Sequence, residues 1–244
     1  MNRSSLDPGT YDRSGAWIVD HAVRALATGC AEGERPVPPV GAVVLGPENV
    51  SVRLTTPDEA PPPGWNAEDD GRTWRASLPW LRTVAVDAGL PDPFPMLVSV
   101  GVIGEGRLLL NLAQAGGIIS LEGDTALARR LLHTWSRRLS TSPWAGGTRV
   151  VRVGFEPDAA NACLDVSRLA EAASVLDDPE GGALLFADPP ERRDLYQVTR
   201  LLADPARRWV VVAAGADDAT WRFTVDMSGT IDTGLLGELV HPRS

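Results

Sequence analysis

The stretch Gly116–Leu132, GGIISLEGDTALARRLL, decides how the second half of the chain folds. It runs from a short apolar segment through a glycine turn into a segment with the spacing of an amphipathic helix. A strand, a glycine turn and a helix in this order are typical of a phosphate-binding loop. Glu122 and Asp124, however, stand where such a loop needs basic or neutral donors. The stretch therefore predicts either a nucleotide site or the fold of such a site without the groups that bind the nucleotide.

The turn lacks the groups that hold a phosphate. A working loop has the form GxxxxGK[ST], in which backbone N–H groups surround the phosphates and the lysine reaches the outer ones. Here Gly123 is the one glycine between strand and helix, and the chain contains no lysine at all. Asp124 is placed to cap the following helix with its own carboxylate, and Glu122 adds a second negative charge. Thr125 alone matches the magnesium ligand, so we expect no nucleotide cofactor.

Apolar segments alternate with helical segments from Gly117 onward. Strands of unbroken apolar character between helices predict a parallel sheet with both faces covered. We therefore predict an α/β fold class, with a three-layer α/β domain over residues 96–244. Residues 1–95 form an N-terminal helix plus a β-hairpin appendage, interrupted by the proline-rich segments EGERPVPP and GLPDPFP.

Several carboxylates follow the predicted parallel strands. Asp188 comes after the strand ALLFA, and Glu156 and Asp158 come after RVVRVGF. Because sites in open parallel sheets form at the carboxyl ends of the strands, these groups and Asp124 make that edge acidic. One interpretation is therefore a hydrolase that holds a divalent metal on Asp124, Glu156 and Asp188.

The helix after the turn has a basic face. Arg129, Arg130 and Arg137 lie on the side opposite its leucines, where we expect His133 to be a solvated surface residue. Arginine and tryptophan are frequent at protein interfaces. The sequence therefore predicts a protein contact at these three arginines, with Trp80 and Trp144 as further candidates.

Composition excludes several classes of protein. The net charge of −9 argues against a nucleic-acid binder, since phosphate neutralisation supplies most non-specific affinity. The two cysteines, Cys30 and Cys163, have no metal-ligand or disulfide-framework spacing. No apolar run approaches the roughly 20 residues of a membrane span, and the amino terminus has no apolar signal core. We therefore predict a cytoplasmic chain with no transmembrane segment.

The second half resembles a known family. The segment RLLLNLAQAGGIISLEGDTALARRLLHTWSRRLSTSPWAGGTRVVRVGFEPD resembles the strand, loop, long helix and next strand of the RecA-like motor domain in FtsK/SpoIIIE-type translocases and type VII secretion ATPases. ALLFADPPERRDLYQVTRLL and the following RWVVVAAGADDATWRFTVD resemble the Walker B strand, its helix and the next strand. The resemblance implies a three-layer RecA-like parallel sheet with an antiparallel hairpin-rich N-terminal addition.

The chain is similar, more closely, to the degenerate form of this domain in actinobacterial multidomain membrane proteins that carry LysM or transcriptional-activator modules. There, too, a hairpin-rich segment with a DDGRTW-like strand comes first, and an LEGD-type turn replaces the phosphate loop. Gly123 and Thr125 match the end of that loop, and Asp188 matches the Walker B aspartate. Without the lysine or an acidic neighbour of Asp188, the resemblance implies a fold and not an activity.

Two functions follow as predictions. The first is a non-catalytic pseudo-ATPase that serves as an interaction or assembly module, with a protein partner or as a homo-oligomer, in a membrane-associated assembly if the resemblance extends that far. The second is a metal- or nucleotide-dependent hydrolase that uses the carboxylates of the sheet edge. The sequence alone leaves both open.

Overall fold

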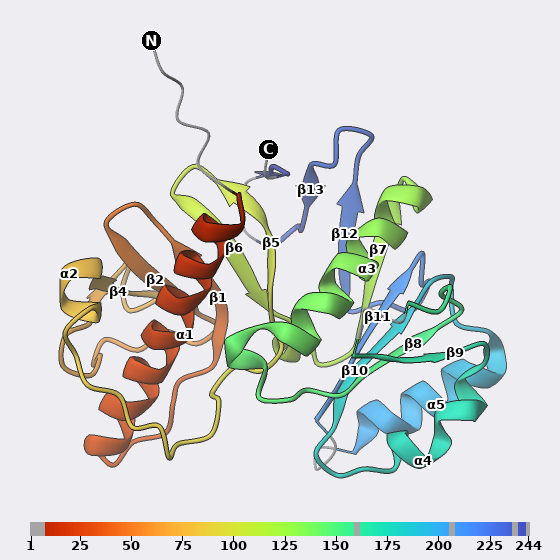
Figure 1. The fold of residues 1–244 in the computed structure, drawn as a ribbon, viewed down its shortest axis with the longest axis horizontal. Helices are drawn as coiled ribbons and strands as arrows, with labels where there is room; N and C mark the ends of the chain where they lie inside the picture. Colours follow the sequence, from red (N-terminus) through yellow and green to blue (C-terminus); the bar gives the residue numbers. More distant parts are fainter. Residues whose placement is uncertain (1–7, 159–161, 205–207, 236–238, 243–244) are drawn as a thin grey trace.

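The computed structural model describes residues 8–158, 162–204, 208–235 and 239–242 (Figure 1). The helices in these ranges are α1 (Pro8–Glu32), α2 (Leu78–Leu81), α3 (Thr125–Thr141), α4 (Ala173–Leu176) and α5 (Arg192–Ala203). Three short 3-10 helices accompany them, η1 (Leu112–Ala115), η2 (Pro143–Ala145) and η3 (Leu169–Ala172).

The first half builds an antiparallel sheet of six strands. In spatial order these are β3 (Asn66–Glu68), β4 (Thr73–Ser77), β2 (Asn49–Leu54), β1 (Val40–Leu45), β6 (Gly106–Asn111) and β5 (Leu97–Ile103). Every neighbouring pair is antiparallel. A tight turn joins β1 to β2, in which the Gly46 N–H donates to the Asn49 carbonyl at 2.9 Å.

The second sheet has eight strands. Their order is β14 (Leu239–Val240), β13 (Ile231–Asp232), β12 (Trp221–Val225), β7 (Ile118–Gly123), β11 (Trp209–Ala214), β10 (Gly182–Phe186), β8 (Val150–Val153) and β9 (Leu164–Val166). Pairing is parallel from β12 to β9, whereas β13 and β14 join antiparallel. The apolar strands β10 and β11 are buried along their whole length.

Helix α3 lies between the two sheets (Figure 1). Its Leu132 and Trp135 share one core with Val98 of the first sheet and Val212 of the second. Helix α1 covers the other face of the first sheet, and α4 and α5 cover the other face of the second. The layers are therefore helix, sheet, helix, sheet, helix.

The two sheets are joined at one edge. Val102 of β5 and His241, which follows β14, exchange two backbone hydrogen bonds of 2.9 Å. The strands consequently form one continuous surface that folds around α3.

The predicted fold class is wrong. Instead of a three-layer RecA-like parallel sheet, the described residues form one wholly antiparallel sheet of six strands and one mixed sheet of eight, with five α-helices. The chain is richer in β-structure than predicted because β6 pairs with β1 and β5 pairs with β6, and because the C-terminal segment folds back as β13 and β14. The division into residues 1–95 and 96–244 stays a prediction, although β5 and β6 lie in the first sheet.

Candidate functional site

A small pocket lies where the parallel strands β7 and β11 end. It has a volume of about 200 Å³, and its walls include Glu122, Gly123, Thr125, Asp188 and Gly215. The structure therefore brings most of the predicted phosphate-loop position together with the Walker B-like Asp188. We call this site the carboxyl-edge pocket.

Asp124 caps α3 as predicted. Its Oδ1 accepts a hydrogen bond of 2.9 Å from the Leu127 N–H, and its own N–H donates to the Val225 carbonyl at 3.0 Å. The preceding Gly123 has a φ of +93°, and a Cβ there would lie 2.2 Å from the Val225 oxygen. The turn is thus held against β12, and a helix N–H that would otherwise face an anion binds Asp124 instead.

The two carboxylates of the pocket wall are both paired with arginine. Glu122 forms an ion pair with Arg222 of β12, and Asp188 forms one with Arg129 of α3. Arg129 also donates from Nε to the Ala187 carbonyl at 3.1 Å. These side chains are about one third to two thirds exposed, so each pair contributes only about 0–1 kcal/mol to stability. Their main effect is to neutralise the pocket wall.

The predicted metal ligands do not converge. Among the described residues, no three His, Cys, Asp or Glu side chains lie close enough to hold a metal ion. Asp124 is occupied as a cap and Asp188 by Arg129. Glu156 is exposed in the segment after β8, where its backbone carbonyl accepts from Arg152 at 2.9 Å.

Sequence reasoning missed a buried polar network beside α3. Arg152 of β8 is fully buried; its Nε donates to Asp165 Oδ1 at 2.5 Å, and its Nη1 donates to His133 Nδ1 at 3.0 Å. The His133 Nε2 lies 3.6 Å from Asp158 Oδ2. His133 is therefore not the solvated residue that we predicted but a half-buried link between α3 and the β8–β9 edge. The arginine in the otherwise apolar strand VVRV was the available signal.

No activated thiol accompanies this histidine. Burial raises the pKa of Cys163 above its ordinary value, and it does the same for Cys30. A raised pKa keeps a thiol protonated and weakly nucleophilic. Cys30 is buried and Cys163 is partly buried, and neither forms a disulfide.

The predicted interface residues divide into two groups. Arg130 and Arg137 are exposed on α3, as expected, whereas Arg129 is paired. Trp80 is half-buried, with its ring over Gly64 and edge-on to Trp65.

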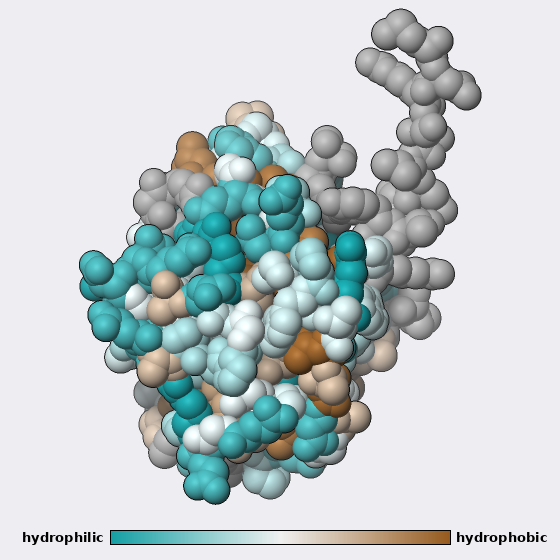
Figure 2. All heavy atoms as spheres, turned by 90° about the vertical axis from the view of Figure 1, so that its left-hand side faces the viewer, coloured by the Kyte–Doolittle hydropathy of each residue, from teal (hydrophilic) through white to brown (hydrophobic). Residues whose placement is uncertain are grey.

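Trp144 is not a surface residue. It is 1% exposed and donates from Nε1 to the Leu97 carbonyl at 2.8 Å, so it belongs to the core beneath α1. The prediction of a contact at Trp144 is wrong because a 3-10 turn, η2, directs its indole inward. Of the tryptophans, Trp17 of α1 is the most exposed, at 51%; it stacks on His21 with ring centres 5.0 Å apart. In Figure 2, which faces α1 and α2, apolar residues appear in small separate groups.

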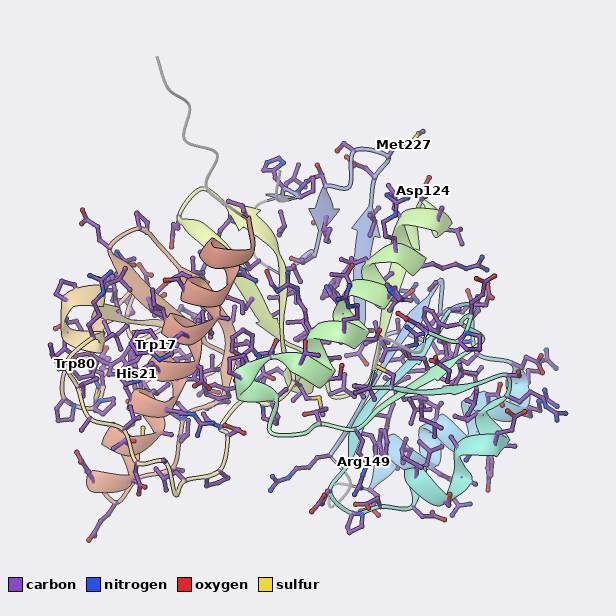
Figure 3. The ribbon with its side chains drawn as sticks, viewed as in Figure 1. Trp17, His21, Trp80, Asp124, Arg149 and Met227 are labelled. Carbon is purple, nitrogen blue, oxygen red and sulfur yellow. The ribbon has the colours of Figure 1, made fainter. Side chains whose placement is uncertain are left out.

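A larger cavity lies at the opposite end of the strands. It measures about 1110 Å³, and its walls include Pro38 and Pro93 of the predicted proline-rich breaks, Gly117, Gly147 and Arg149. Figure 3 shows Asp124 near the top and Arg149 near the bottom of the part of the molecule that holds the second sheet. Arg149 is paired with Asp178 and Glu180, so this cleft offers no free arginine at that position.

Comparison with known proteins leaves the family open. The sequence matches no protein-family model, and no curated protein sequence matches it either. The resemblance to degenerate motor domains therefore stays a prediction. Among the described residues, no helix combines the length and apolar character needed to cross a bilayer.

Proposed function

We propose that this chain is a non-catalytic interaction or assembly module that does not use nucleotide. One observation carries the proposal: every charged group of the carboxyl-edge pocket already has a partner within the chain. Glu122 pairs with Arg222, Asp188 pairs with Arg129, and Asp124 caps α3. A ligand phosphate would have to displace these contacts without a lysine to replace them.

The size of the pocket supports the same conclusion. Sites for cofactors and drug-sized ligands commonly measure about 300–1,000 Å³. The carboxyl-edge pocket, at about 200 Å³, is smaller than this range. A nucleoside triphosphate would need the turn at Gly123 to move away from β12, against the hydrogen bond from the Asp124 N–H to the Val225 carbonyl.

The exposed side of α3 supplies a contact surface for a protein partner or a second copy of the chain. Arg130 and Arg137 are seven residues apart and so lie about 10 Å apart along one helix face. Thr134 and Thr141 turn their hydroxyls back to the carbonyls of Arg130 and Arg137, which leaves the two arginines as the groups that face outward. We also propose a cytoplasmic location, which the two free cysteines support because thiols stay reduced there.

Calorimetric titration of ATP and ADP, with magnesium, into the purified chain tests the proposal. We expect no binding up to millimolar nucleotide, and no increase in melting temperature with nucleotide or magnesium. Micromolar binding would refute the proposal. The variant Arg130→Ala/Arg137→Ala, compared by sedimentation with a control that removes the exposed Arg72 and Arg82, then tests α3 as the contact surface.

A further inference from the structure

We infer that the outer face of α5 is a docking surface for an acidic protein segment. Arg192, Tyr196 and Arg200 recur every four residues on this helix and are all exposed. Residues four apart share a helix face, so they form a stripe about 12 Å long, with Tyr196 between the two arginines along the helix. We call it the α5 stripe.

The stripe is held on a rigid support. On the opposite side of α5, Val198 is 0% exposed and Leu201 is 4% exposed, and both pack in the core against the second sheet. Helix α5 forms the outer layer on this side of the molecule (Figure 1). The stripe therefore faces away from the protein, and docking would order few additional groups.

Tyr196 is unusual for its exposure. Its side chain is 71% exposed, although an aromatic ring normally gains free energy by burial. Tyrosine and arginine are enriched among the residues that dominate binding at protein interfaces. A ring between two arginines offers an apolar surface and two charge-assisted donors together.

The positive charge of the α5 stripe is not neutralised by carboxylates of the described residues. Neither Arg192 nor Arg200 has an ion-pair or hydrogen-bond partner among the described residues, in a chain with a net charge of −9. The nearby acids are engaged by Arg193, which lies 3.0 Å from Glu191 and 3.9 Å from Asp194. Two free cations at a fixed spacing on an acidic protein therefore complement carboxylates of a partner.

The observations favour a protein segment over the other polyanions. Nucleic acid and anionic membranes attract proteins through many cations, whereas the α5 stripe offers two. Two carboxylates about 12 Å apart, by contrast, occur in an extended segment at a spacing of four residues. The inference adds a partner class to the proposed interaction function, but it does not depend on whether nucleotide binds.

Fluorescence anisotropy with a labelled poly-glutamate peptide of about 12 residues tests the inference, with poly-glutamine of equal length as the control peptide. We expect salt-sensitive binding of poly-glutamate alone. Arg192→Ala/Arg200→Ala should weaken it about fivefold to tenfold, and Tyr196→Ala should weaken it more than Tyr196→Phe.

The matched control removes two arginines elsewhere, in Arg72→Ala/Arg82→Ala. Both residues are exposed, and neither has an ion pair among the described residues. This variant should bind poly-glutamate as the natural chain does.

Three results would overturn the inference: no binding of poly-glutamate, equal weakening in the Arg72→Ala/Arg82→Ala control, or tighter binding of duplex DNA or phosphatidylglycerol vesicles through the α5 stripe. The nucleotide titration is a separate measurement, so failure of the docking surface and failure of the proposed function can be distinguished.

Discussion

Replacing Asp165 by asparagine tests the buried network beside α3. The Arg152 side chain is 0% exposed and that of Asp165 is 12% exposed, and their contact distance is 2.5 Å. Asparagine keeps the shape of the side chain and removes its charge. The guanidinium would then keep the Glu156 carbonyl and His133 Nδ1 as its hydrogen-bond partners, without a carboxylate. Breaking a buried ion pair by removing one partner costs about 3–5 kcal/mol, and we expect about 3 kcal/mol because an amide oxygen remains as an acceptor.

Urea denaturation followed by tryptophan fluorescence measures this loss of unfolding free energy. The exposed pair between Arg168 and Glu171 provides the control, because their side chains are 67% and 42% exposed. Glu171→Gln should cost less than about 1 kcal/mol, since solvent screens such a pair. If Asp165→Asn costs much more than Glu171→Gln, the loss of stability comes from the arginine charge that stays buried and not from the loss of an ion pair in general.

A double-mutant cycle with Arg152→Met completes the test. Because methionine removes the buried charge, the variant Arg152→Met/Asp165→Asn should be destabilised by less than the sum of the two single changes. A loss below about 1 kcal/mol for Asp165→Asn, or strict additivity in the cycle, would refute the reasoning.

Three further predictions concern local contacts. Asp124→Ala should lower the unfolding free energy by about 1 kcal/mol, measured by denaturation, because α3 loses its cap; an unchanged stability would contradict the capping role. Trp144→Ala should cost about 3–5 kcal/mol and Trp80→Ala clearly less in the same assay, since only the former is fully buried. Hydrogen bonds led by that from Ser228 lower the pKa of Asp226 below its ordinary value of 3.8. Asp226 therefore stabilises the β12–β13 turn above that value and loses this effect as the pH falls through the lower, folded pKa, so Asp226→Asn should lower the melting temperature at neutral pH and progressively less in acid.

The carboxyl-edge pocket could be predicted only in part. The position of Glu122 and Asp124 after an apolar strand was readable because strand, turn and helix follow each other in the chain. The neutralisation of Glu122 was not readable, since Arg222 lies 100 residues from it and reaches it only through the pairing of β12 with β7. The pairing of Arg129 with Asp188 spans 59 residues and depends equally on strand order.

Local pattern and tertiary contact thus determined different parts of this protein. The sequence by itself determined the cap at Asp124 and the alternation of apolar strands with helices after Gly117, because each depends on neighbours within a few residues. Only the tertiary structure decided that α3 lies between two sheets, that Trp144 points inward and that Val102 meets His241. Those outcomes depend on which apolar faces meet, and many strand orders satisfy the same local pattern. The energy of side-chain packing selects among them.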